Sequence, residues 1–267
     1  MQVAARTGAW AKRDSPTPSA YGGLRFTAES ANSSVQLTKV GSAPSVTLVK
    51  SFDGVNWEEY SVGDVIELPT VGYSVYLAAG EGGNETFGSS ASGYHEFFVN
   101  GLVAASGDIT SLRRFDLIQT PLAIYCYNSM FYGCTGLTSA PELPATTLAI
   151  SCYKYMFRGC TGLTSAPELP ATTLKSFCYS YMFDGCTGLT SAPELPATTL
   201  ANSCYQYMFR GCVQLSLIKV HFTAWGSQTS KWVSNVASTG TFCKPRVLTE
   251  EYGDGKIPTG WTVVNID

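Results

Sequence analysis

The sequence predicts a mainly β protein with short helices, in which an antiparallel β-sandwich is followed by a stack of repeated units and a terminal cap. Two observations predict this class. Short β-prone runs separated by turn residues fill residues 23–117. An internal repeat with a period of 26 residues fills residues 118–220. The remaining segments are an amino-terminal arm at 1–22 and a cap at 221–267.

The composition narrows the function classes. The chain has 267 residues, of which 45% are hydrophobic and only 14% are charged, with a formal net charge of −3. Soluble chains usually carry about 25% charged residues. The slightly acidic balance gives no electrostatic attraction for nucleic acid. Its apolar runs fall far short of the roughly 20 residues that span a bilayer. We therefore expect no nucleic-acid partner and no membrane span.

The amino-terminal arm does not have the pattern of a secretory signal. Arg6, Lys12, Arg13 and Asp14 interrupt every apolar stretch, so no continuous apolar segment forms. One interpretation is a flexible tail or linker. The other is a docking arm that becomes ordered on a partner, with Trp10, Lys12 and Arg13 as its contact residues.

The segment at 23–117 has the pattern of an antiparallel, Ig-like sandwich. Its β-prone runs lie at 23–27, 35–40, 45–52, 55–60, 65–68, 74–79 and 96–99. Asp53-Gly54 between two of these runs predicts a hairpin. The Gly-rich stretch 80–88 has no Gly-Lys-Ser/Thr ending and carries two Glu, so we expect a loop and not a phosphate site. We interpret His95 as a histidine at a strand edge.

The repeat decides the architecture of the second half. Each of four units contains Cys-Tyr, then Met-Phe, then Gly-Cys, and the Cys-Tyr pairs begin at Cys126, Cys152, Cys178 and Cys204. The run Cys-Thr-Gly-Leu-Thr-Ser-Ala-Pro-Glu-Leu-Pro-Ala-Thr-Thr-Leu recurs without change at 134–148, 160–174 and 186–200. Leucine-rich repeats have periods of about 20–29 residues. One unit cannot bury its own apolar face, so the units must stack as a solenoid.

Each part of the unit has a predicted role. Cys152 and Met156 are four residues apart, so a short helical turn would present them together. Gly159 suits the left-handed position that ends a helix. Leu163 and Leu169 are expected to point inward, and the prolines should keep the following stretch short or kinked.

The cysteines follow the repeat. Eight of the nine fall at two positions per unit, with a spacing of eight, and no His lies in the array. Zinc sites use shorter spacings, and disulfide frameworks are typical of short secreted chains. We expect reduced, buried ladders of thiols and no metal, with some oxidation as the alternative. Cys243 lies outside the ladders.

Charged and variable positions supply the candidate binding residues. Glu142, Glu168 and Glu194 form a column if the units stack, which is either solvated or holds a cation or ligand. Other positions differ between units, either through neutral drift or because they form a contact face. The candidate binding residues on this face are Lys154, Arg158, Lys175, Ser180, Asp184, Gln206 and Arg210.

The carboxyl end is expected to cover the open end of the stack. Solenoids need atypical terminal units. Large apolar residues for this cap are Trp225, Trp232, Phe242, Ile257 and Trp261. The segment 229–237 is predicted to be a short helix with Thr229 or Ser230 as its N-cap. His221 is expected to pack in the cap.

The repeat resembles a known family. Met156-Phe157-Arg158-Gly159-Cys160-Thr161-Gly162-Leu163 stands where the BspA-type leucine-rich repeats of bacterial surface proteins have Ala-Phe-x-x-Cys-x-x-Leu. The end of the chain is similar to the cap of such proteins. The module before the repeats resembles the β-sandwich that often precedes them in proteins of gut bacteria and their phages.

The resemblance implies adhesion without catalysis and without a cofactor. Because no export signal is recognised, we expect a bacteriophage virion protein, in a capsid, tail fibre or decoration. Its arm would bind other virion proteins, and its repeats would bind a host-surface glycan or protein. Homo-oligomerisation is left open. The alternative is a secreted adhesin on a bacterial cell surface. A remote alternative is a glycan-acting enzyme using Glu142 and Glu168, although their identical surroundings give no reason for different pKa values.

Overall fold

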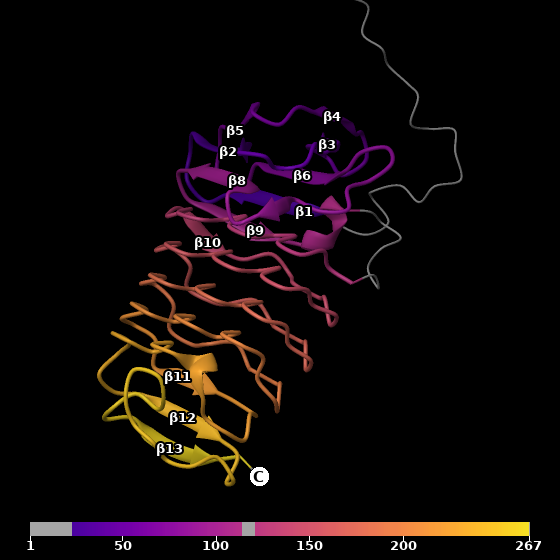
Figure 1. Ribbon diagram of the computed structural model, residues 1–267. Helices are drawn as coiled ribbons and strands as arrows, with labels where there is room; N and C mark the ends of the chain where they lie inside the picture. The colour runs from indigo at the N-terminus through magenta and orange to yellow at the C-terminus, as the bar shows by residue number, and fades with distance from the viewer. Residues whose placement is uncertain (1–22, 114–120, 267) are drawn as a thin grey trace, which may run out of the picture.

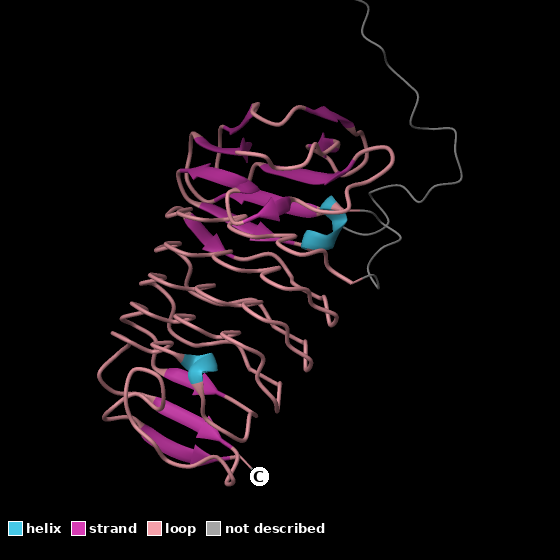
Figure 2. Ribbon diagram, viewed as in Figure 1, coloured by secondary structure: helices cyan, strands magenta, loops and turns pink. Residues whose placement is uncertain are grey.

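The computed structural model describes residues 23–113 and 121–266 and is mainly β (Figure 1). The predicted fold class is confirmed at this level. There are fewer short helices than predicted. The described residues contain only two short 3₁₀ turns, η2 (Ile109–Leu112) and η3 (Ser227–Thr229) (Figure 2). The described residues include no apolar helix of membrane-spanning length.

The first module contains two sheets. One has the strand order β10-β9-β1-β6-β3-β4, and the other has the order β5-β2-β8-β7. Their bounds are β1 (Leu24–Ala28), β2 (Ser33–Val40), β3 (Leu48–Ser51), β4 (Glu58–Tyr60), β5 (Val65–Leu68), β6 (Ser74–Ala79), β7 (Gly88–Ser90), β8 (Gly93–Asn100), β9 (Val103–Ser106) and β10 (Leu137–Ser139). Neighbouring strands are antiparallel except β9 and β10, which are parallel.

Alternating apolar residues build the core between these sheets. In β1 the burial pattern alternates from residue to residue, and Phe26 of β1 meets Phe97 of β8 with ring centroids 5.0 Å apart. The predicted Asp53-Gly54 hairpin is confirmed, because β3 pairs with β4 around it. The Asp53 carboxylate accepts hydrogen bonds from the amides of Val55 and Asn56, which fixes the turn.

His95 is not at a strand edge. It lies in β8, which has β2 on one side and β7 on the other, and its side chain is buried. Its Nδ1 lies 2.9 Å from the Phe87 carbonyl oxygen. The interpretation as an edge histidine was wrong because the short strand β7, which was not predicted, covers that side.

The repeats stack on one another as successive coils (Figure 1). In the unit that contains Tyr153, alternate amides make two kinds of hydrogen bond. The amides of Tyr153 and Phe157 donate to carbonyls of the next unit, at Cys178 and Met182. The amide of Met156, between them, donates back to the carbonyl of Tyr153. Each coil is thereby tied to the next.

The predicted helical turn in the repeat does not form. Ser151, Tyr155 and Gly159 all have positive φ, of 56°, 60° and 76°, so a left-handed residue recurs at every fourth position. A right-handed helix excludes such residues. The spacing of Cys152 and Met156 was therefore misinterpreted, because half of the amides bond between coils and not within a helix. The left-handed conformation expected for Gly159 is confirmed.

Identical side chains form continuous ladders inside the stack. Buried tyrosine rings stack from unit to unit, as do buried phenylalanine rings, with centroids between 5.4 and 6.1 Å apart. The eight repeat cysteines are buried free thiols, and Cys160 Sγ donates to the Phe131 carbonyl at 2.9 Å. Leu163 and Leu169 point inward, as predicted.

The first module closes one end of the stack. Phe97 of β8 stacks on Phe131 of the first repeat with centroids 5.2 Å apart. β10 of that repeat pairs with β9. The two parts therefore share one continuous hydrophobic core.

The carboxyl-terminal segment closes the other end. Trp232 is fully buried and packs against Tyr205 and Phe209, the last rings of both ladders. Beside it lies a parallel sheet of β11 (Leu217–Lys219), β12 (Thr241–Lys244) and β13 (Thr262–Asn265). The predicted packing of large apolar residues here is confirmed.

The predicted helix at 229–237 is absent. After η3 the segment continues in turns, with positive φ at Lys231 and Asn235. The amides of Tyr207 and Phe209 donate to the carbonyls of Ser230 and Trp232. The segment therefore acts as one more coil, because its carbonyls satisfy the amides of the last repeat.

Candidate functional site: an arginine–tyrosine face on the repeats

The left-handed residues of the repeat bring one tyrosine per unit toward the surface. Tyr155, Tyr181 and Tyr207 have φ of 60°, 58° and 57°. Their neighbours Tyr153 and Met156 are fully buried, whereas these three tyrosines are only partly buried. The three rings follow one another along the stack, with centroids 4.9 and 4.5 Å apart.

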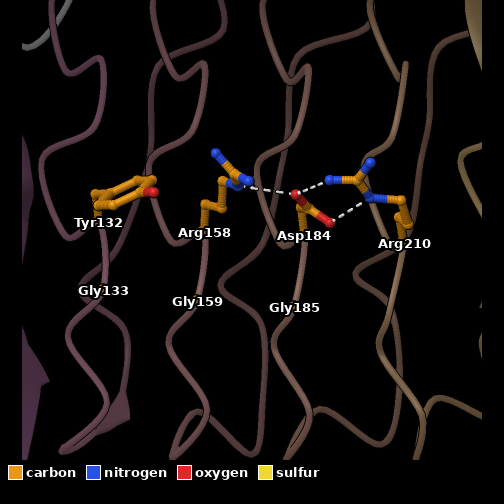
Figure 3. Close-up of a pocket in the computed structure, with 7 residues that line it drawn as sticks. All are labelled: Tyr132, Gly133, Arg158, Gly159, Asp184, Gly185 and Arg210. Carbon is orange, nitrogen blue, oxygen red and sulfur yellow. Dashed lines mark hydrogen bonds and ion pairs between the residues drawn. The ribbon is translucent and has the colours of Figure 1, made fainter.

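A second row runs beside the tyrosines, three residues later in each unit. It consists of Tyr132, Arg158, Asp184 and Arg210, one from each successive coil (Figure 3). Arg158 Nε donates to Asp184 Oδ2 at 2.8 Å. Arg210 donates from Nε to Oδ1 at 2.8 Å and from Nη2 to Oδ2 at 2.6 Å. Asp184 thus lies between two arginines and accepts three hydrogen bonds.

The two rows hold one another in place. Arg158 lies over the ring of Tyr132 at 5.5 Å and over that of Tyr155 at 5.6 Å. Arg210 lies over the ring of Tyr207 at 4.6 Å. Such cation–π contacts fix the guanidinium planes. We call the surface the arginine–tyrosine face; its residues are Tyr132, Lys154, Tyr155, Arg158, Tyr181, Asp184, Tyr207 and Arg210.

A hollow of about 330 Å³ lies on this face. Its lining consists of the row from Tyr132 to Arg210 together with Gly133, Gly159 and Gly185. A methyl group on Gly159 would lie 3.6 Å from the Cα of Gly133, the equivalent glycine of the preceding unit. A methyl group on Gly185 would lie 3.8 Å from the Cα of Gly159. The backbone of the three glycines therefore forms the floor of the hollow, and the arginine side chains form its sides.

The protonation states make the face rich in hydrogen-bond donors. The hydrogen bond to Asp184 raises the pKa of Arg210. Burial raises the pKa of Tyr155 and Tyr181, so their phenols stay neutral at pH 7. Burial lowers the pKa of Lys154, whose Nζ lies 4.9 Å from the ring centre of Tyr155. Three basic side chains, Lys154, Arg158 and Arg210, accompany the single carboxylate of Asp184 on this face.

The structure brings together only part of the candidate set. Arg158, Asp184 and Arg210 form one cluster, and Lys154 lies beside it over Tyr155 and Phe177. Lys175 is exposed and lies outside this cluster and outside the hollow, so the structure does not place it in the binding face.

Ser180 is not a surface residue. It is fully buried, and its Oγ donates to the Gln206 carbonyl at 3.3 Å. Gln206 is partly buried, and its carbonyl accepts bonds from the unit before it. Ser180 is therefore wrong as a contact residue, because the short hydroxyl bonds to the next coil instead of reaching solvent.

The glutamate column is exposed and lies outside this hollow. Glu194 forms an ion pair with Lys219 at 2.9 Å and a hydrogen bond with Nε2 of His221 at 2.5 Å, and these two contacts lower the pKa of Glu194. His221 is therefore a partly exposed partner of Glu194 at the start of the predicted cap. Within the described ranges, no group of three or more His, Cys, Asp or Glu residues could hold a metal ion.

Trp10, Lys12 and Arg13 lie outside the described residues. The tyrosines at 132, 155, 181 and 207 were missed, because candidates were chosen where the last three units differ. Tyr155, Tyr181 and Tyr207 are identical in those units, and the first unit, which has Ser129 and Tyr132 at the two corresponding positions, was not compared. The sequence did contain a signal. The first tyrosine of Cys-Tyr-x-Tyr-Met-Phe is enough to form the buried ladder, so the second tyrosine needs another role.

Comparison with known proteins adds no relative. No family model, no curated protein and no solved structure matches this chain.

Proposed function

We propose that this chain is a non-enzymatic attachment protein of a bacteriophage particle, whose repeats form a leucine-rich-repeat solenoid that binds a ligand on the host cell surface. The observation that carries the proposal is the arginine–tyrosine face. It places charged and phenolic groups from four successive coils in one solvent-facing hollow on an otherwise nearly neutral stack.

The solenoid assignment is supported by the bonding between coils. Amides of one unit donate to carbonyls of the next in a constant offset, and inward leucines and stacked rings repeat in every unit. The two sheets of the first module support an Ig-like sandwich. The motif around Met156 to Leu163 supports the BspA-type family.

A binding role fits the chemistry better than catalysis. Asp184, the carboxylate of the hollow, accepts three hydrogen bonds from arginines and is nearly buried, so it is poorly placed to take a proton from a substrate. Glu142 and Glu168, the pair that a glycan-acting enzyme would need, are exposed and lie outside the hollow. The enzyme remains a remote alternative.

The proposed setting of the protein is a bacteriophage particle. The phage assignment rests on the resemblance of the two modules, and the segment 1–22 is proposed to bind other virion proteins. A secreted adhesin on a bacterial surface is the alternative, and it would use the same face. A chain lacking residues 1–22 should keep ligand binding and lose incorporation into particles.

Binding is tested by incubating fluorescently labelled full-length chain with a panel of bacterial cells. The proposal expects saturable adsorption to some strains, which Arg158→Gln with Arg210→Gln abolishes and Lys175→Gln does not. Lys175→Gln is the matched control, because it removes one positive charge from an exposed position in the same repeats. Adsorption that ignores the arginine variants would contradict the assignment of the face.

The setting is tested with antibodies against the chain. Gold labelling of phage particles in a lysate, with unlabelled cell envelopes, is the expected result. Labelling of the bacterial envelope without particle labelling would overturn the virion assignment in favour of the adhesin.

A further inference from the structure

The arginine–tyrosine face has many hydrogen-bond donors and few free acceptors. Asp184 already accepts three N–H groups. By contrast, Nη1 and Nη2 of Arg158 and Nη1 of Arg210 make no hydrogen bond among the described residues, and both arginine side chains are about one third exposed, at 37% and 35%. The unpaired guanidinium N–H groups of the hollow are therefore available to a ligand that carries hydrogen-bond acceptors.

The charge balance selects an anionic ligand. Lys154, Arg158 and Arg210 outnumber the single carboxylate of Asp184. Guanidinium groups bind carboxylate, sulfate and phosphate through paired hydrogen bonds. An acidic group that approaches from solvent, above the nearly buried carboxylate of Asp184, would meet the N–H groups of Arg158 and Arg210 that Asp184 does not occupy.

The stacking of the tyrosines argues against nucleic acid. Single strands bind by stacking their bases on open aromatic faces. Here the ring of Tyr181 is covered by Tyr155 on one side and by Tyr207 on the other. Arg158 lies 5.6 Å from the ring centre of Tyr155, and Arg210 lies 4.6 Å from that of Tyr207. These three rings therefore offer a ligand mainly their edges and hydroxyl groups.

The shortage of acceptors argues against a peptide. A peptide backbone carries N–H donors that need partners, and the carboxylate of the hollow is already occupied. Sugar hydroxyls can accept hydrogen bonds from the phenols and guanidiniums. The row also runs along the stack, one residue per coil, which suits an extended polymer (Figure 3).

We propose that the hollow between Tyr132 and Arg210 binds an acidic polysaccharide, with one of its anionic groups held by Arg158 and Arg210 above the glycine floor. This inference rests on the proposed attachment function and names the ligand class of the same face. The carboxylate and the sulfate of such polymers share this chemistry.

The test uses an oligogalacturonate, its methyl ester and polyglutamate as probes, with binding to the full-length chain measured by calorimetry. The methyl ester keeps the sugar chain and removes the charge. We expect oligogalacturonate to bind, and the ester to bind at least about tenfold more weakly, because the ester cannot form charge-assisted hydrogen bonds with the guanidinium groups. An oligosaccharide sulfate in parallel distinguishes sulfate from carboxylate.

The variants Arg158→Gln and Arg210→Gln should each weaken binding about tenfold. Lys175→Gln should leave it nearly unchanged, because an exposed and screened charge contributes little. Tyr132→Phe removes the hydroxyl of the phenol that lines the hollow, without touching the ion pairs, and should weaken binding a few-fold. This last variant keeps the test decisive if an arginine variant unfolds.

Three results would overturn the inference. The first is an ester that binds as tightly as the acid. The second is polyglutamate that binds as tightly as oligogalacturonate, with the same dependence on both arginines. The third is that none of the acidic probes binds. If labelled chain still adsorbs to cells through Arg158 and Arg210 in those cases, the attachment function stands and only the ligand class is wrong. Loss of cell adsorption would instead remove the attachment function itself.

Discussion

Arg210 and Asp184, which lie 26 residues apart at the same position of successive repeats, are joined by two parallel hydrogen bonds of 2.8 and 2.6 Å. Asp184 is only 6% exposed and also accepts a bond from Arg158. The repeat thus uses a position that varies between units to place a negative charge between two positive ones.

Replacing Asp184 with Ala is expected to destabilise the fold. The change removes three charge-assisted hydrogen bonds and leaves two guanidinium groups facing each other. Because the arginines are partly solvated, we expect a loss of about 1–3 kcal/mol in the free energy of unfolding, measured with urea. The control is Glu168→Ala, which removes an exposed carboxylate and should change stability by less than about 0.5 kcal/mol. Equal effects of the two substitutions would contradict this role.

The eight repeat cysteines are expected to resist alkylation in the folded chain. Burial raises the pKa of Cys178, Cys186 and Cys204 to about 12, so almost no thiolate exists at pH 8. Mass spectrometry after iodoacetamide treatment should find label on the less buried Cys243 alone. All nine should be labelled in urea. Label on repeat cysteines without urea would indicate coils that open readily.

The sequence predicted the stack but not the path of its backbone. The 26-residue period and the inward leucines were explicit in the residues. The residues did not reveal that amides such as those of Tyr153 and Met156 donate alternately to the next coil and within their own coil. That pattern depends on the carbonyls of the next coil. Local spacing favoured a helix, and bonding between coils overrode it. The same cause removed the predicted helix around Trp232.

The candidate face was predicted in part for a related reason. Arg158, Asp184 and Arg210 were found because they differ between units. Lys154 and Ser180 also differ and occupy equivalent positions, yet the long Lys side chain reaches the surface and the short Ser hydroxyl bonds to the next coil. The exposure of Tyr181 comes from its left-handed backbone, which a pattern of residue types does not specify.

Tyr181 allows the cost of that backbone to be measured. Tyr181→Ala removes ring contacts with Tyr155 and Tyr207 but keeps a side chain at a φ of 58°. Tyr181→Gly removes the same contacts and relieves the strain. We expect the glycine variant to be more stable than the alanine variant by about 1 kcal/mol in urea unfolding. Alanine is usually the more stabilising of the two residues, so this order of stabilities would be the reverse of the usual one. A Tyr181→Ala variant at least as stable as Tyr181→Gly would show that the backbone at this position is not strained.

His95 is expected to make the fold sensitive to mild acid. Burial lowers its pKa below the ordinary 6.5, an effect that Lys39 on the neighbouring strand reinforces and the contact with the Phe87 carbonyl opposes. The unfolded chain therefore binds a proton more readily than the folded chain. Stability is fully present above about pH 6.5 and falls as the pH drops toward the lowered pKa of the folded state.

The measurement is the urea midpoint at about pH 7.5 and about pH 5.5 for the native chain and for His95→Gln, which titrates nothing in this window. Glu96, beside it, has a pKa raised from 4.5 by burial, so its contribution has the opposite sign and is largest at lower pH. The native chain should lose more stability between the two pH values than the variant does. An equal loss in both would mean that other groups, and not the buried imidazole, set the acid limit of this fold.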